Sequence, residues 1–146
     1  MKKVDCIKCE NTSCIFKNSH SSKWLENSLY QNGQHIFIEN MSVTGLYVVQ
    51  KGIIQEFYTD KNGIKKIRHT ANNGEIFGHK DYSATKHAFS AIAIEDSQIC
   101  LLKKNTLYQV CKNNSELSLK LMNFFVAELN KSDNTHKHNF YNLDKI

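Results

Sequence analysis

Short segments punctuated by glycine dominate the middle of this chain and constrain its fold more than any other feature. All six glycines fall between positions 33 and 78, at or near the ends of segments rich in β-branched and aromatic residues. Glycine takes positive φ without steric cost, so these glycines predict tight turns, with a hairpin loop at residues 60–63 (Asp-Lys-Asn-Gly). The expected strands are residues 35–39, 46–50, 53–59, 64–70, 89–95 and 97–103. Such regular short strands favour an antiparallel sandwich or roll.

The chain after residue 104 has a helical pattern. Asn105 or Thr106 can cap a short helix that runs to Cys111, and Ser115 can cap a longer helix. The apolar residues of the longer segment follow one stripe. They are Leu117, Leu121, Phe124, Phe125 and Leu129. This stripe either packs onto the β-domain or meets a second copy of the helix in a dimer.

Two polar segments have weaker patterns. Residues 17–32 carry Trp24, Leu25 and Leu29 at helical spacing, which favours a short helix before the strands. The tail from Asn130 onward either extends the long helix or frays. Neither segment contains an internal repeat or a low-complexity block.

Composition limits the class of protein. At 146 residues the chain is long enough for one domain with a real core. Its net charge of +5 (19 − 14) is compatible with nucleic acid nearby but too weak to indicate it. The first residues lack the apolar core of a signal peptide, and no run approaches the ~20 apolar residues of a membrane span. We therefore expect a cytoplasmic protein, where an odd count of five cysteines favours metal or redox chemistry over structural disulfides.

The cysteines are clustered at one end of the sequence. Cys6, Cys9 and Cys14 lie within nine residues of each other, and Cys100 stands alone in a predicted strand. Three thiolates on one short loop, with a distant fourth on a folded core, suit a metal centre used for sensing. Zinc held by the three clustered cysteines and His20 is an alternative, in which the segment would be structural. A segment with free or oxidised thiols and no metal is the third possibility.

The string GLYVVQKGIIQEFYTDKNGIKKIRHTANNGEIFG (residues 45–78) resembles the effector domain of the Crp/Fnr transcription regulators. The matching features are a strand ending in LYxVxxG, a turn and return strand around xxGxxxxI, and a GxxxG step. The resemblance implies a mainly β fold with α, an antiparallel β-roll (a jelly roll of the cyclic-nucleotide-binding type) followed by a long dimerisation helix. The expected division is an N-terminal arm (1–16), the β-roll effector domain (17–114), and the dimerisation helix and tail (115–146).

The cysteine-bearing arm resembles that of the oxygen-sensing Fnr branch of this family. By that resemblance, Cys6, Cys9, Cys14 and Cys100 would bind one [4Fe–4S] cluster. The gap between Cys9 and Cys14 is one residue shorter than in the branch, and the linker after Cys14 is also short. Cys111 matches no ligand, and its place on a predicted helix favours a buried small hydrophobe.

The resemblance also places an effector pocket in the β-roll. Its candidate residues are Gly74, Glu75, Gly78, His79, Phe89 and Ser90. Nucleotide-binding members use an Arg-Ser pair at the cyclic phosphate, and this chain has Phe89-Ser90 there. Lys80 or Lys86 would offer only a point charge without the bidentate fork of arginine, which argues against a cyclic nucleotide. Phe89 and Ile92 are expected to fill the pocket.

His79 and one run of basic residues can each be interpreted in two ways. His79 is either a ligand-binding residue or a surface or hydrogen-bonded histidine. The basic run of Lys61, Lys65, Lys66, Arg68 and His69 is expected to be a solvated face of a hairpin rather than a nucleic-acid patch.

The predicted function is the sensory and dimerisation part of a bacterial transcription regulator. We expect a homodimer that reaches DNA only through a winged helix-turn-helix outside this chain. A stand-alone or degenerate ligand-binding module is the alternative. The chain is not expected to be an enzyme, because it has no Ser/His/Asp order and no P-loop, and Cys14 with His20 lacks a third orienting group.

Overall fold

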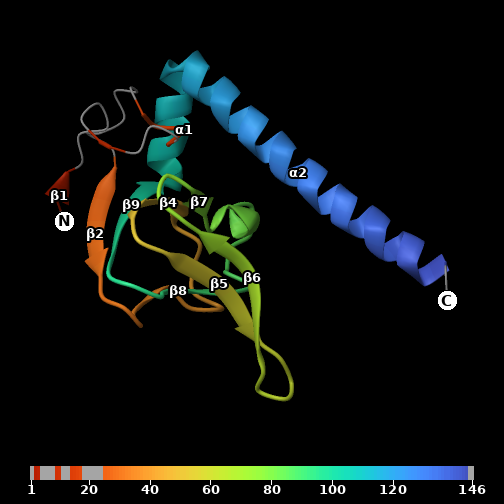
Figure 1. Ribbon diagram of the computed structural model, residues 1–146. Helices are drawn as coiled ribbons and strands as arrows, with labels where there is room; N and C mark the ends of the chain where they lie inside the picture. Colours follow the sequence, from red (N-terminus) through yellow and green to blue (C-terminus); the bar gives the residue numbers. More distant parts are fainter. Residues whose placement is uncertain (1, 4–8, 11–13, 18–24, 145–146) are drawn as a thin grey trace. The chain divides into compact units, whose positions relative to one another are not determined.

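The computed structural model describes residues 2–3, 9–10, 14–17 and 25–144, and the chain divides into two compact units (Figure 1). The first unit, Met1–Val110, holds the strands, and the second, Cys111–Ile146, is helical. The elements in chain order are β1 (Lys2–Lys3), β2 (Glu26–Tyr30), β3 (His35–Phe37), β4 (Gly45–Lys51), β5 (Ile54–Thr59), β6 (Lys65–Ala71), β7 (Ile76–Phe77), the 3₁₀ helix η2 (His79–Asp81), β8 (Ser90–Ala93), β9 (Ser97–Lys103), α1 (Lys104–Asn113) and α2 (Ser115–Asp144).

The strands form two antiparallel sheets. One has the order β1-β2-β9-β4-β7 and the other β3-β8-β5-β6, so strands distant in sequence become neighbours. The six strands expected from the glycine pattern are all present, within a few residues of their predicted ends. The prediction of a mainly β fold, an antiparallel jelly roll followed by helices, is confirmed.

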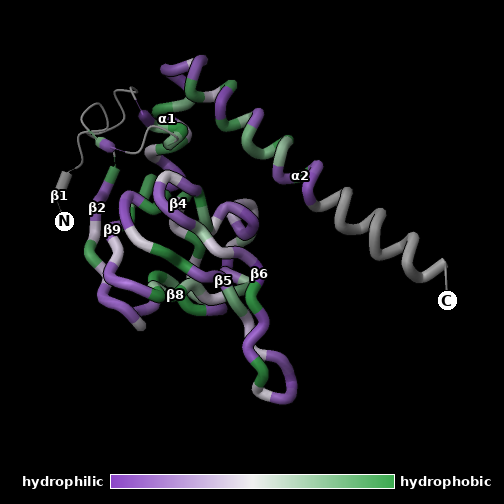
Figure 2. The backbone as a smooth tube through the Cα atoms, viewed as in Figure 1, coloured by the Kyte–Doolittle hydropathy of each residue, from purple (hydrophilic) through white to green (hydrophobic). Residues whose placement is uncertain are grey.

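The core lies between the inner faces of the two sheets. It collects buried residues from both sheets, among them Phe37, Tyr47, Ile54 and Phe77. The rings of Tyr47 and Phe77 stack at 5.1 Å between centroids, which fixes the short strand β7 against β4. Figure 2 shows hydrophobic residues interspersed with hydrophilic ones along the strands.

Two glycines show why these positions exclude other residues. Gly63 closes the β5–β6 hairpin at φ 77°, and the Asp60 carboxylate accepts the N–H groups of Asn62 and Ile64, both at 2.9 Å. A Cβ at Gly45 would lie 2.0 Å from the carbonyl oxygen of Leu102, where β4 pairs with β9. The hairpin loop predicted at residues 60–63 is therefore confirmed.

The segment before the first predicted strand is not helical where the structure describes it. Glu26–Tyr30 forms β2, which pairs along its whole length with β9, while residues 18–24, including Trp24, lie outside the described residues. Leu25 is buried and Leu29 is 70% exposed, so the two leucines do not share the face that their spacing suggested. Pairing with the distant β9 decides the conformation here, against the local helical pattern.

The helices begin and end differently from the prediction in detail. α1 starts at Lys104, ahead of both expected caps. The side chain of Asn114, not Ser115, caps α2 by accepting the N–H of Leu117 at 3.0 Å. The tail continues the helix to Asp144. Among the described residues, no helix is long and apolar enough to cross a membrane.

Candidate functional site

Three of the described cysteines lie close enough to interact electrostatically. Cys100, on β9, is 6% exposed, and Cys9 and Cys14 are half-buried. Burial raises the pKa of the Cys100 thiol to about 11, a hydrogen bond from Asn27 opposes the rise, and Cys14 and Cys9 add to it. The structure therefore brings two residues of the N-terminal segment toward the predicted distant ligand.

The segment around Cys14 is itself ordered by polar contacts. Burial raises the pKa of the Cys14 thiol, while hydrogen bonding to the backbone at Phe16 lowers it. Phe16 is fully buried, and the Lys17 ammonium donates to the carbonyl oxygen of Cys9. Phe16 thus anchors this part of the segment by burial, and Lys17 ties it to Cys9.

Thiolates are suitable donors for a metal ion, but the described residues do not form a complete metal-binding site. Within the described ranges, no group of three or more His, Cys, Asp or Glu side chains is arranged to hold a metal ion. Cys6 and His20 lie outside the described residues, so their predicted ligand roles remain predictions. Cys111 is half-buried rather than fully buried, so the expected buried hydrophobe is only partly realised.

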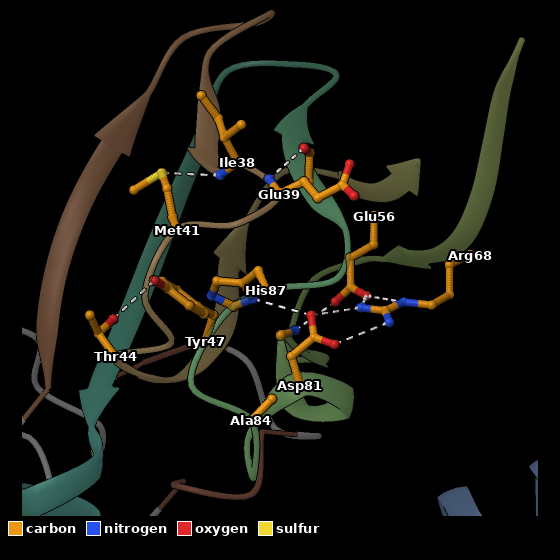
Figure 3. A network of polar contacts seen from close by, with 12 residues as sticks. Ile38, Glu39, Met41, Thr44, Tyr47, Glu56, Arg68, Asp81, Ala84 and His87 are labelled. Carbon is orange, nitrogen blue, oxygen red and sulfur yellow. Dashed lines mark hydrogen bonds and ion pairs between the residues drawn. The ribbon is translucent and has the colours of Figure 1, made fainter. Parts of the chain in front are cut away.

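A cluster of polar and charged side chains lies inside the β-roll (Figure 3). Arg68 on β6 donates from Nη2 and Nε to Oε2 of Glu56 on β5, at 2.7 and 2.9 Å. Its contacts with the Asp81 carboxylate are longer, at 3.3 and 3.4 Å. His87 Nδ1 lies 3.2 Å from Asp81 Oδ2, and its ring stacks on Phe37 at 3.6 Å. We call these four residues, Glu56, Arg68, Asp81 and His87, the buried ion network.

The buried ion network also fixes the local backbone. Glu56 is 0% exposed, and its Oε1 accepts the N–H of Gly78 at 2.6 Å. Gly78 precedes η2 at φ 73°, and a Cβ there would lie 2.9 Å from the Tyr47 ring. Two carboxylates face a single guanidinium, so the guanidinium has no free charge to offer an incoming anion.

The predicted pocket residues fall in different environments. Gly74, Gly78 and His79 are buried and Glu75 is exposed. The buried Ser90 accepts the N–H of Glu39 through its hydroxyl at 2.9 Å. His79 is 4% exposed with its ring 5.8 Å from that of His69, so it is not a surface histidine.

Phe89 packs against Arg68, which the sequence analysis did not identify as a site residue. The guanidinium carbon of Arg68 lies 3.5 Å from the centroid of the half-buried Phe89 ring. The prediction that Arg68 belongs to a solvated basic face is therefore wrong, although Lys61, Lys65 and Lys66 are exposed. One signal in the sequence could have indicated a buried acidic partner for Arg68. Glu56 follows the apolar Ile54 by two residues, so both side chains lie on the inward face of the same strand.

A family model described as "Cyclic nucleotide-binding domain" matches residues 28–114, more than half of the chain. The chain belongs to the cyclic nucleotide-binding domain family. No curated protein sequence matches it.

Solved structures with this fold include several regulators. The catabolite activator protein of Thermus thermophilus is 20% identical with a TM-score of 0.74, covering 84% of this chain and 61% of its own. FixK2 of Bradyrhizobium japonicum is 22% identical with a TM-score of 0.65, covering 75% and 55%. The sensor domain of the transcriptional regulator DNR from Pseudomonas aeruginosa is 15% identical with a TM-score of 0.69, covering 82% and 85%. This chain thus spans about three fifths of the first two, and the predicted resemblance to Crp/Fnr effector domains is confirmed as a likeness of fold.

The cyclic nucleotide-binding domain is followed by a helix with exposed apolar residues. Leu119, Met122, Val126 and Leu129 are 59%, 60%, 50% and 63% exposed. Their spacing of i, i+3, i+7 and i+10 is that of the a and d positions of a coiled coil, and we call these four residues the α2 seam. Of the stripe predicted from sequence, Leu117 and Leu121 are buried and Phe124 and Phe125 are half-buried, leaving only Leu129 in this set.

Proposed function

We propose that this domain is the sensory and dimerisation part of a cytoplasmic Crp/Fnr-type transcription regulator that responds to oxygen or redox state. It would do so through a [4Fe–4S] cluster bound by Cys6, Cys9, Cys14 and Cys100. What supports the proposal is the thiolate chemistry of these four cysteines, together with the contribution of Cys14 and Cys9 to the raised pKa of the Cys100 thiol, although the described residues alone form no metal-holding group. DNA contact would come from a separate winged helix-turn-helix domain.

The four predicted ligands lie in two different parts of the chain. Cys100 lies on β9, which pairs with β2 on one side and β4 on the other, and the other three predicted ligands belong to the N-terminal segment. The bound cluster would supply an oxygen-labile centre. Because these ligands would join the N-terminal segment to β9, loss of the cluster would remove that link, which is a local change able to bias a dimer interface.

The metal proposal is tested by purification without oxygen, followed by visible absorption spectroscopy with iron and sulfide analysis. We expect a broad band that bleaches in air and is lost in Cys100→Ser. Cys111→Ser is the matched control and should keep the band. A colourless protein with stoichiometric zinc would favour the structural alternative, and a metal-free one the degenerate module.

The buried ion network supports a proposal about the effector. The fork of Arg68 is already paired with Glu56 and Asp81, so a cyclic phosphate would have to displace a buried carboxylate. We expect that cAMP and cGMP at millimolar concentration leave the melting temperature of the protein unchanged. A concentration-dependent rise in melting temperature would contradict this, because a ligand that binds only the folded state raises stability.

The α2 seam supports a homodimer. Four large apolar side chains exposed on one helix face are unusual for a monomer, and a parallel copy of the same helix has the complementary spacing. Phe140 and Leu143 return to the same register 21 and 24 residues after Leu119, after one heptad whose a and d positions are the polar Asp133 and His136. We therefore assign dimerisation to the α2 seam rather than to Leu117 and Leu121, which are buried within one chain.

A further inference from the structure

Asn27 is the one side chain that the structure places in hydrogen-bond contact with the sulfur of Cys100, among the described residues. Its Nδ2 lies 3.5 Å from Cys100 Sγ, a distance within the range of an N–H···S hydrogen bond, and Asn27 is 8% exposed. The contact is set by the sheet, because Asn27 on β2 and Cys100 on β9 are directly paired in register. The donor and the sulfur therefore meet through backbone pairing rather than through a flexible loop.

A second hydrogen bond fixes the orientation of the Asn27 amide. The same Nδ2 donates to Oε1 of Gln50 at 2.7 Å, from the end of β4 on the other side of β9. An amide nitrogen carries two hydrogens, so one goes to Gln50 and the other to the sulfur. Three neighbouring strands thus hold one N–H on the sulfur of Cys100.

From this geometry we infer that Asn27 is a positioning residue for the metal centre: it donates an N–H···S hydrogen bond that orients the Cys100 thiolate and withdraws electron density from its sulfur. This inference rests on the proposed function, because it concerns the same thiol site. Such outer hydrogen bonds orient metal ligands and tune the metal.

The purpose of this donor follows from the burial of Cys100. A thiolate in an apolar core is poorly solvated, and a buried charge without a hydrogen-bond partner is costly. A donor held by the sheet offsets part of this cost before metal binds and remains in place afterwards. The alternative is that Asn27 merely satisfies Gln50, in which case the sulfur contact has no consequence for metal binding.

The test uses Co²⁺ alone as the probe, added without oxygen to the reduced chain, with the sulfur-to-cobalt charge-transfer band as the readout. In Asn27→Leu we expect the apparent dissociation constant for Co²⁺ to rise about tenfold, the lower end of the effect of losing an outer partner. The band should also move to lower energy, because a sulfur without its hydrogen bond gives up an electron more readily. Asn27→Asp, which keeps the shape but has no donor at neutral pH, should shift the band in the same direction.

Leu25→Val is the matched control, since Leu25 is buried two residues earlier and is 3% exposed. It should destabilise the same strand without moving the band. If the parent protein gives the thiolate band and the Asn27 variants give it at the same energy, the inference is wrong and the metal site stands. If the parent gives no thiolate band with Co²⁺, and no cluster, the proposed metal site and this inference fall together.

Discussion

Replacing Glu56 by glutamine should lower the free energy of unfolding by about 3 kcal/mol or more, a large share of the stability of a domain of this size. Glu56 is 0% exposed and accepts two hydrogen bonds from Arg68 and one from Gly78. Glutamine fits the space, but it leaves the guanidinium of Arg68, 14% exposed, with only its long contacts to Asp81. Urea denaturation followed by circular dichroism measures the change.

Two further variants separate the buried charge from charge in general. Glu75→Gln makes the same substitution at an exposed position and should change stability by less than about 0.5 kcal/mol. Adding Arg68→Met to Glu56→Gln should cost less than the sum of the two single changes, because the second removes the charge that the first left unpaired. Equal stability of Glu56→Gln and the parent protein would show that Asp81 is a sufficient charge partner for Arg68.

The strands could be predicted because their information is local. Glycines at turns and alternating apolar residues are visible in a window of ten residues, as at the hairpin closed by Gly63. β2 could not be predicted in this way, since Leu25 and Leu29 have helical spacing and the strand forms only through its pairing with β9, about 70 residues later. A helix-like pattern of two leucines is too weak to compete with five paired residues.

The candidate sites also differ in whether the sequence information for them is local or long-range. The cysteines could be singled out because their residue type is rare and their spacing is local, but their role as metal ligands stays a prediction. The buried ion network joins β5, β6, η2 and the segment before β8, and no local pattern marks Arg68 as different from the exposed Lys66 beside it. Which face of an edge strand turns inward is decided by the partner strand, and a single sequence does not contain that pairing explicitly.

The helix after the β-roll shows how burial changes an interpretation made from periodicity. Leu117, Leu121 and Phe124 do form an apolar stripe, but Leu117 and Leu121 are buried within the chain. α2 has two apolar faces, and periodicity alone does not show which of them is buried within the chain. The exposed α2 seam is the face that the proposed dimer would use.

Met122→Glu should therefore weaken self-association by roughly 100-fold or more. A dimer buries two copies of Met122, each contributing about 1.5–3 kcal/mol, and every 1.4 kcal/mol is about tenfold in the dissociation constant. The variant also brings two like charges together at the seam. Sedimentation equilibrium across a range of protein concentrations measures the dissociation constant directly.

Asn123→Glu and Phe124→Glu decide between the two faces of α2. Asn123 is exposed and lies next to Met122 at an e position, which flanks the a and d residues, so Asn123→Glu should weaken association less than Met122→Glu. Phe124 is half-buried, with its ring 5.4 Å from that of Phe125, so Phe124→Glu should affect stability more than association. If Phe124→Glu separates the dimer while Met122→Glu does not, the stripe predicted from periodicity is the interface and the α2 seam meets some other partner. If only Met122→Glu separates it, the exposed a and d positions of the α2 seam are the dimer interface.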